Sequence, residues 1–266
     1  MTDSKSSTDG PSQKLATHTL TDLYFRDQNL VTEMMGQMSF TEAMIRHILG
    51  REPSSADIAI IDAVLICLME HGLTPSAIAA RLTYHSAPEA LQAGVAAGLL
   101  NVGSTFVGTM ENTAKLLREM MDDPNGIEAA AERIVGEHRA TRKHLPGFGH
   151  HLHKPDDPRS PKLFEIARAN GVDGRYIDAI GILNRAVDAA YGKHLTINAT
   201  GATAAVLSEI GIAPEIMRGF AVISRAAGLV AHIAEEQAVP TARTIWDVVE
   251  EKIPYSGNAP IDDHGS

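Results

Sequence analysis

The segment from Pro146 to Arg159, PGFGHHLHKPDDPR, concentrates the residues of this chain whose types and spacing could do chemistry. Its two glycines and three prolines predict a loop whose backbone can approach a ligand closely. The same loop carries several groups that donate hydrogen bonds or positive charge: His150, His151, His153, Lys154 and Arg159. Imidazole, ammonium and guanidinium groups together favour the binding of an anion.

The histidines of this loop also raise a metal hypothesis. None of them stands at helical spacing from a carboxylate as in H-E-x-x-H, and Cys67 is the only cysteine. Neutral imidazole acting as a hydrogen-bond donor is therefore the favoured use, and no metal is expected. The GxxxxGK[ST], GxGxxG and GxSxG signatures are missing too, which leaves nucleotide hydrolysis and esterase chemistry without support.

A second set of polar residues follows a predicted helix from Pro214 to about Gln237. Arg218, Arg225 and His232 are spaced seven apart, close to two helical turns, so they share one stripe. Arg218 is equally consistent with a solvated ion pair to a glutamate of the same helix. Arg225 has small or apolar neighbours, and a desolvated guanidinium requires a carboxylate or phosphate partner. We therefore interpret Arg225 as a binding residue.

His71 lies at the C-terminal end of another predicted helix, between Glu70 and Gly72. A histidine at this position can stabilise the negative end of the helix dipole. It can equally face a ligand where the helix stops. The sequence leaves both interpretations open.

The bulk composition bounds the class of protein. The 266 residues are 44% hydrophobic and 21% charged, which is typical of a globular chain with a substantial core. A net charge of -10 argues against binding to nucleic acid or to an anionic membrane, so an anionic ligand needs a local basic cluster. The single cysteine favours a reducing cytoplasm. The uncharged run from Ala90 to Met110 is only mildly apolar and predicts a helix buried on all sides, not a membrane span.

Helix punctuation recurs along most of the chain and predicts an all-α fold. Residues 1–16 have little to bury and predict a disordered lead-in. The segment Leu195–Ile197 is the best candidate in a chain almost without strand patterns. Helix starts are expected after Ser54, at Thr74-Pro75, at a capping box over Ser86–Glu89, at Asp157-Pro158, near Asp173, at Pro214 and near Thr244.

The glycine–histidine loop followed by Asp157-Pro158-Arg159 resembles the citrate synthase superfamily. From about Leu20 to Tyr255 the chain is similar to the citryl-CoA lyase module that ends ATP-citrate lyase. Further matching segments follow in the same order: MEHG at 69–72, AGLLNVG at 97–103, INATG at 197–201, ISRAAGLVAH at 223–232, and Arg243 shortly before Trp246.

This resemblance implies a citrate-synthase-like homodimer, or a larger assembly of such dimers. A large helical lobe would comprise residues 17–111 and 216–266, and a small helical lobe residues 112–215, with coenzyme A in the cleft between them. Coenzyme A would be part of a thioester substrate, with no tightly bound cofactor.

The resemblance also implies roles for individual residues. His150 would hydrogen-bond the keto or hydroxyl oxygen of the substrate, with His71 and Thr200 as further catalytic positions. The substrate carboxylates would be bound by His71, Arg159 and Arg225, with His151 and Asn198 nearby and Arg243 entering the neighbouring subunit's site. Coenzyme A would contact Pro146, Gly147, Phe148, Gly149, His153 and either Lys154 or Lys193.

Three positions depart from the family pattern. Thr200 stands where the family has a catalytic aspartate, and a hydroxyl cannot exchange protons near pH 7 as a carboxylate can. Phe106 stands where citrate synthases place the histidine that holds the enolate oxygen. His151 replaces an arginine of the lyase module.

The chemistry that remains is cleavage of a carbon–carbon bond in citryl-CoA or a related carboxylated 3-hydroxyacyl-CoA, giving acetyl-CoA and a 2-oxoacid. His150 could accept the hydroxyl proton, and loop N–H groups, Asn198 or Thr200 could stabilise the enolate by roughly 3–4 kcal/mol. Water, His71 or His151 would have to protonate the enolate carbon. Condensation, thioester hydrolysis and acyl-CoA binding without catalysis are the alternatives.

Overall fold

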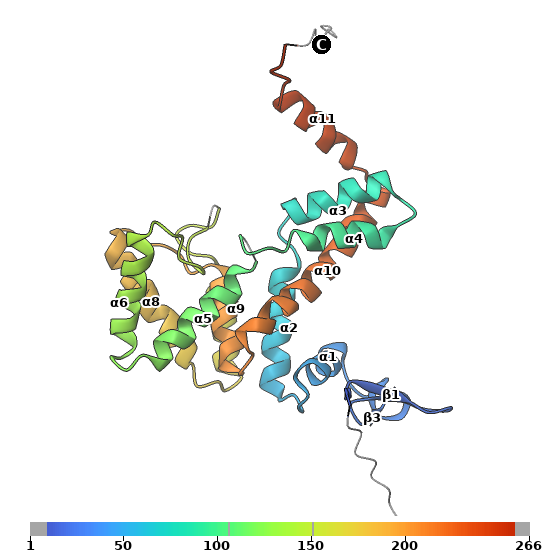
Figure 1. The fold of residues 1–266 in the computed structure, drawn as a ribbon, viewed down its shortest axis with the longest axis horizontal. Coiled ribbons are helices and arrows are strands. Elements are labelled where there is room, and N and C mark those ends of the chain that lie inside the picture. The colour runs from blue at the N-terminus through green and yellow to red at the C-terminus, as the bar shows by residue number, and fades with distance from the viewer. Residues whose placement is uncertain (1–9, 106, 151, 259–266) are drawn as a thin grey trace, which may run out of the picture.

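The computed structural model describes residues 10–105, 107–150 and 152–258. Within these ranges the chain forms eleven α-helices, one π-helical turn and three short strands. Figure 1 shows the helices in two groups, with α5, α6, α8 and α9 in one and α2, α3, α4 and α10 in the other. The prediction of a mainly helical fold is confirmed.

The N-terminal part contains a small antiparallel sheet that the sequence did not predict. Strands β1 (Ala16–His18), β2 (Leu23–Phe25) and β3 (Gln28–Asn29) pair in the order β1-β2-β3, and the turn η1 (Leu30–Met34) follows. Strands of two or three residues are too short to display an alternating pattern. Ala16, assigned to the lead-in, is already the first residue of β1.

The first helices are α1 (Phe40–Leu49), α2 (Ser55–Met69) and α3 (Pro75–Ser86). Ser54 caps α2 through a capping box with Asp57, which explains why this start was predictable. The predicted capping box over Ser86–Glu89 is wrong. Ser86 ends α3, and its hydroxyl donates to the carbonyl of Leu82.

The predicted single helix over Ala90–Met110 is also wrong, because α4 (Leu91–Leu100) ends before a loop that leads to α5 (Thr109–Asp122). Its glycines nevertheless allow close packing. A Cβ atom on Gly98 would lie 2.6 Å from the Leu229 side chain and 2.9 Å from the carbonyl oxygen of Ser76. The opposite face of α4 leaves Leu100 exposed, so the helix is not buried on all sides.

The second group consists of α5, α6 (Ile127–Ala140), α7 (Arg159–Ala169), α8 (Arg175–Tyr191) and α9 (Ala199–Glu209). Helix α9 is almost entirely buried and packs against α5, α7 and α8. One core lies among α5, α6, α8 and α9, and a second core joins α1, α2 and α10 to parts of α5, α7 and α9. The division into lobes at residues 111 and 216 stays a prediction.

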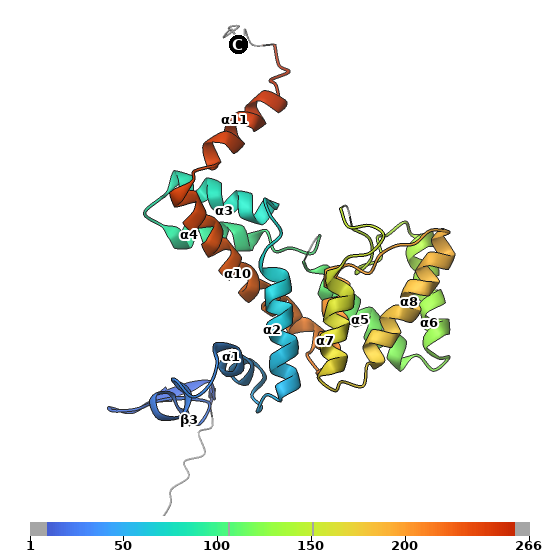
Figure 2. The ribbon, with the colours of Figure 1, turned by 180° about the vertical axis from the view of Figure 1, so that it is seen from behind.

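Helix α10 (Pro214–Ala238) is central to the fold and packs against α2, α3, α4 and α5. Among the described helices, it alone is long and apolar enough to span a membrane. Half of its most apolar window is buried in the protein, as expected for a core helix. Helix α11 (Ala242–Lys252) then projects away from the other helices (Figure 2). The expected segment Leu195–Ile197 forms only an isolated bridge between Ile197 and Phe148.

Candidate functional site

A cavity of about 630 Å³ lies between the end of α2, the start of α7 and the middle of α10. We call it the α2–α10 pocket. Its lining brings together three residues that the sequence separates widely, His71, Arg159 and Arg225. These are the three side chains predicted to bind carboxylates, and they face a common space. Cys67, Glu70, Thr74, Ser76 and Asn101 add further polar groups to the wall.

Arg225 is the most unusual charge in this pocket. It is only 7% exposed, and its Nη1 atom has no hydrogen-bond partner within the described part of the chain. Glu70 Oε1 lies 4.0 Å from Nη1, beyond hydrogen-bond distance. Burial lowers the pKa of the Arg225 guanidinium, and the charge of Glu70 opposes this effect. A buried guanidinium in this state is well suited to bind an anionic ligand.

Arg159 is held by Asp157, which is fully buried. The Asp157 carboxylate accepts hydrogen bonds from Arg159 Nε at 2.9 Å and Nη2 at 2.7 Å, and from the backbone N–H of Ala199 at 3.0 Å. Burial raises the pKa of Asp157, but the hydrogen bonds from Arg159 outweigh it and hold the pKa below its ordinary value. Asp157 thus fixes Arg159 to the start of α9. The sequence predicts Asp157 only as part of a helix start and does not indicate this contact with Arg159.

Replacing Asp157 with asparagine should lower the free energy of unfolding by roughly 3 kcal/mol, because Arg159 loses its buried partner. The folded-state pKa of Asp157 is depressed, so its stabilisation is complete above the ordinary value of 3.8 and is lost as pH falls through the folded pKa. Urea unfolding of both proteins from pH 7 downward should show a constant difference that shrinks only below about pH 4.

Asp156→Asn is the matched control. Asp156 is exposed and contacts His194 at the surface, so its replacement should cost less than about 1 kcal/mol. Equal losses for Asp156→Asn and Asp157→Asn would contradict the assignment of Asp157.

His150 and His153 meet His71, which lines the α2–α10 pocket. The ring of His150 lies 5.5 Å from that of His71, at an interplanar angle of 78°, and 4.4 Å from that of His153. Nδ1 of His150 accepts the backbone N–H groups of Leu152 at 3.1 Å and His153 at 3.0 Å. A neutral imidazole that accepts at Nδ1 carries its proton on Nε2. The geometry therefore favours His150 as a hydrogen-bond donor.

The same three histidines could hold a metal ion, since one ring nitrogen of each lies within 4.8 Å of the other two. In the neutral His150 ring, however, Nδ1 accepts from the backbone and Nε2 carries the proton. A metal would have to displace those hydrogen bonds. Hydrogen-bond donation is the use that this arrangement favours, and the expectation of no metal stays a prediction.

The loop from Pro146 to Gly149 is held against the start of α9. Gly147 and Gly149 adopt positive φ angles of 87° and 78°, which glycine tolerates readily. The carbonyl of Gly147 accepts the N–H of Asn198 at 3.0 Å. A Cβ atom on Gly201 would lie 2.4 Å from that same carbonyl oxygen, so the two backbones are in close contact. The Phe148 side chain is buried in the core and serves packing.

Asn198 and Thr200 are both engaged at the N-terminus of α9. The Asn198 Oδ1 atom accepts the N–H of Gly201 at 3.0 Å and the hydroxyl of Thr200 at 2.7 Å. Its Nδ2 group donates to the carbonyl of Gly149 at 3.0 Å. The Thr200 hydroxyl also lies 2.8 Å from that of Thr109. These contacts stabilise the loop, and they leave the enolate-binding roles of Asn198 and Thr200 as predictions.

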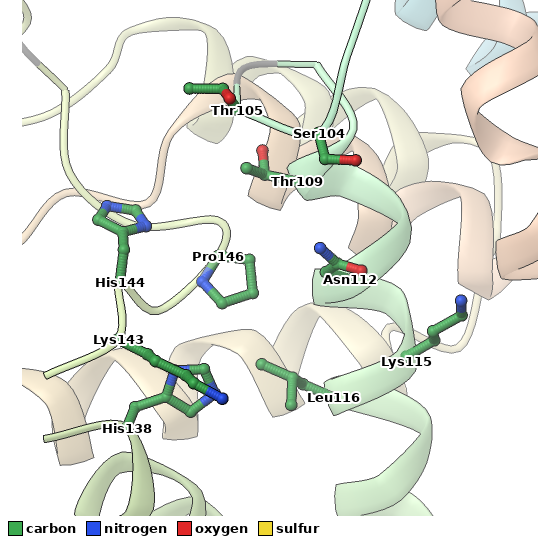
Figure 3. A pocket seen from close by; sticks show the side chains of 10 residues that line it. All are labelled: Ser104, Thr105, Thr109, Asn112, Lys115, Leu116, His138, Lys143, His144 and Pro146. Carbon is green, nitrogen blue, oxygen red and sulfur yellow. The ribbon is translucent and has the colours of Figure 1, made fainter. Parts of the chain in front are cut away.

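A second cavity, of about 640 Å³, lies on the other side of the segment 101–109. Ser104, Thr105 and Thr109 line this second cavity, whereas Asn101 and Val102 line the α2–α10 pocket. In Figure 3, Lys143, His144 and Pro146 lie opposite the side chains of α5 across this space. Residues of the connection between α4 and α5 therefore line both cavities.

Four exposed basic or imidazole side chains surround the entrance of a third cavity, of about 500 Å³, beside Gly149. Lys143 and His144 line both the second and the third cavity. The basic cluster, as we call it, consists of Arg139, Arg142, Lys143 and His144. This cluster was not predicted from the sequence, although the run HRATRKH at 138–144 directly precedes the glycine loop.

Several predicted residues lie elsewhere. Lys154 and Lys193 line none of the three cavities. Arg243 is exposed on α11, where it pairs with Asp247 at 2.9 Å and lies over the Trp246 ring. His151 and Phe106 fall outside the described residues.

The outer part of the arginine stripe forms a surface ion pair. Arg218 donates to Glu111 at 3.2 Å and to Ser104 at 3.3 Å. This agrees with the solvated alternative for Arg218, except that the acidic partner comes from α5 and not from α10.

Comparisons with known proteins agree with this fold. The sequence model of the citrate synthase C-terminal domain matches residues 13–246. Citrate synthase 2 of Bacillus subtilis is 26% identical over 192 residues, covering 70% of this chain and 49% of the relative. ATP-citrate synthase subunit 1 of Sordaria macrospora is 23% identical over 73% of this chain and 31% of its own length. The chain thus spans half or less of these relatives.

Among solved structures, citryl-CoA lyase from Hydrogenobacter thermophilus is 31% identical, with a TM-score of 0.83 over 94% of this chain and 96% of that one. ATP citrate lyase from Methanothrix soehngenii, solved with citrate and coenzyme A, has a TM-score of 0.78 at 20% identity. The match covers 94% of this chain and 42% of the ATP citrate lyase chain. At 20% identity this similarity shows the fold alone.

Proposed function

Because the chain belongs to the citrate synthase family, we propose that it is a lyase that cleaves citryl-CoA, or a related carboxylated 3-hydroxyacyl-CoA, to acetyl-CoA and a 2-oxoacid. One observation carries the proposal: Arg159, Arg225 and His71 face one pocket, with His150 at its edge. The likeness to citryl-CoA lyase over nearly the full length of both chains supports the lyase direction.

The charges of the α2–α10 pocket match those of the acyl end of the substrate. Citryl-CoA carries two free carboxylates, and the α2–α10 pocket presents two guanidinium groups. Arg159 already shares its charge with Asp157, whereas no carboxylate among the described residues is hydrogen-bonded to Arg225. A bidentate contact to a carboxylate would therefore stabilise Arg225 most.

We assign hydrogen-bond donation to His150 and proton transfer to His71. His150 Nε2–H donates to the substrate hydroxyl oxygen and stabilises the carbonyl that forms there. The hydroxyl proton passes to a base, for which His71 is the candidate because its ring is 5.5 Å from that of His150. The carbon–carbon bond breaks, its electron pair forms the acetyl-CoA enolate, and His71 returns the proton to the enolate carbon. This proposal differs from the sequence expectation that His150 is the base, and that expectation stays the alternative.

Glu70 also lines the pocket, but it is not suited to be the missing acid. Burial raises the pKa of Glu70, yet hydrogen bonds from the His71 N–H, from His232 and from the Gly72 N–H hold it below the ordinary value of 4.5. The group is therefore ionised at neutral pH and cannot donate a proton.

The coenzyme A end is proposed to bind at the second and third cavities. The acyl thioester would pass the loop from Pro146 to Gly149, and the phosphates would meet the basic cluster instead of Lys154 or Lys193. This position agrees with the lining of the second cavity and the α2–α10 pocket by residues of the same connection between α4 and α5. It also supplies the local positive charge that an acidic protein needs to bind a phosphorylated ligand.

The double variant Arg142→Gln, Lys143→Gln tests the basic cluster. We expect affinity for coenzyme A to fall about 10-fold at low salt, because each exposed charge contributes up to about 1 kcal/mol. The loss should diminish as salt is added. Calorimetry with Lys193→Gln as the control should show less than about 2-fold change. A larger effect at Lys193 would overturn this placement of the phosphates.

The subunit arrangement and location are part of the proposal. Arg243 is exposed on α11 and does not line the α2–α10 pocket of its own chain, and we propose that it completes the site of a second copy in a homodimer. The substrate thioester supplies coenzyme A, and the protein would work in a reducing cytoplasm.

Incubation with citryl-CoA tests the lyase activity. Equimolar acetyl-CoA and oxaloacetate are the expected products. The relatives named citrate synthase favour condensation as the second candidate. Release of free coenzyme A from acetyl-CoA and oxaloacetate, faster than cleavage, would indicate that second function. Tight binding of coenzyme A without any turnover would indicate a binding protein.

A further inference from the structure

A series of hydrogen-bonded polar groups, buried except at Glu70, connects the start of α11 to the α2–α10 pocket. Its first member is Arg81, which is 1% exposed. Arg81 donates from Nη1 to Glu236 Oε2 at 2.9 Å and from Nε to His232 Nδ1 at 3.0 Å. The carboxylate of Glu236 also accepts the N–H groups of Thr241 and Ala242, each at 2.8 Å. The first turn of α11 is thereby tied to Arg81.

The chain continues from His232 to the end of α2. Because Nδ1 of His232 accepts from Arg81, the neutral ring carries its proton on Nε2 and donates it to Glu70, 3.0 Å away at Oε2. Glu70 Oε1 in turn accepts the backbone N–H groups of His71 at 2.8 Å and Gly72 at 2.7 Å. His232 itself does not line the pocket, so any effect it has must pass through Glu70.

The segment that carries His71 depends on these hydrogen bonds. Helix α2 ends at Met69, so the next residues lack helical hydrogen bonds, and Gly72 turns the chain with a φ angle of 73°. On the other side, a Cβ atom on Gly228 would lie 2.1 Å from the Met69 carbonyl oxygen. Close backbone contact with α10 and the Glu70 carboxylate together fix where His71 stands.

We propose that Glu70 and His232 are positioning residues, which set the place of His71 and the charge environment of Arg225 for the cleavage reaction. The inference rests on the proposed function for its kinetic part only. Glu70 stands 4.0 Å from Arg225, where it offsets the buried charge without occupying the guanidinium. Through Arg81 the same series of hydrogen bonds connects the pocket to α11, the helix that carries Arg243.

Two substitutions of His232 separate its hydrogen bond with Glu70 from its hydrogen bond with Arg81. Glutamine places an amide N–H near the former Nε2 and keeps the donor to Glu70. Asparagine places a carbonyl oxygen near the former Nδ1, so it keeps the acceptor for Arg81 and loses the donor. We expect His232→Asn to raise KM for citryl-CoA about 10-fold, whereas His232→Gln stays within about 3-fold of the wild type.

Hydrogen exchange gives a readout that does not need turnover. The amides of His71 and Gly72 should exchange about 10-fold faster in His232→Asn and in Glu70→Ala than in the wild type. Glu70→Gln keeps an acceptor oxygen and should preserve their protection. Amides in the middle of α8, far from this chain of groups, report global unfolding and should not change.

Unchanged exchange at His71 and Gly72 in both His232→Asn and Glu70→Ala would overturn the inference. Equal KM values for His232→Asn and His232→Gln, both shifted, would overturn it too, because the donor to Glu70 would not matter. If His232→Asn fails to fold, the amide exchange of His71 and Gly72 can be compared between Glu70→Ala and Glu70→Gln. The Glu70 side chain is half-exposed, so these variants are expected to fold. A wild type without lyase activity would contradict the proposed function, and the exchange comparison would still decide the positioning role.

Discussion

Arg225→Ala is expected to weaken the binding of oxaloacetate or citrate about 100-fold, while affinity for coenzyme A changes less than about 3-fold. A 100-fold change corresponds to roughly 2.7 kcal/mol, within the range for loss of a buried, hydrogen-bonded charge. The selectivity follows from the position of Arg225 in the α2–α10 pocket, away from the basic cluster. Calorimetry with each ligand separately measures both affinities.

Two further variants sharpen this prediction. Arg225→Lys keeps the charge but not the planar fork, so its affinity should lie between those of the wild type and Arg225→Ala. Arg218→Ala is the control on the same helix, because Arg218 pairs with Glu111 outside the α2–α10 pocket. Equal weakening of carboxylate and coenzyme A binding by Arg225→Ala would contradict the assignment.

His150→Ala should reduce kcat for citryl-CoA cleavage by about 100-fold to 10,000-fold, with little effect on coenzyme A affinity. The reason is that Nε2–H of His150 is the proposed donor to the oxygen that becomes a carbonyl. His150→Gln tests the role more finely, since an amide can donate a hydrogen bond but cannot accept a proton as a base. Partial activity in His150→Gln would support donation.

His194→Ala serves as the control for the histidine variants. His194 is exposed and paired with Asp188 and Asp156, so its removal should leave kcat unchanged. If His150→Gln were as inactive as His150→Ala, a proton-accepting role would replace the donor role. Full activity of His150→Ala would remove His150 from the mechanism.

Much of the helical fold was predictable from local signals. The capping box of Ser54 with Asp57 and the proline at the start of α10 mark helix starts by chemistry that acts within a few residues. The failures lie where local signals mislead. The run from Ala90 to Met110 has no charge to mark a boundary, so the end of α4 at Leu100 was invisible.

The candidate site was predictable where a residue carried its own argument. Arg225 stood out because an arginine among small and apolar neighbours must be desolvated, and the structure buries it. Glu70 belongs to the MEHG segment, but its role could not be predicted, because it contacts His232, which is 162 residues away in the sequence. Contacts of this kind arise only when α2 and α10 pack together, and no local pattern encodes them.

A crystal structure with citrate and coenzyme A bound tests the central claim most directly. It should show carboxylates of citrate within hydrogen-bond distance of Arg225 and Arg159, His150 near the citrate hydroxyl, and the coenzyme A phosphates beside Lys143. Citrate bound away from the α2–α10 pocket, or coenzyme A in a place that the loop from Pro146 to Gly149 does not touch, would contradict it.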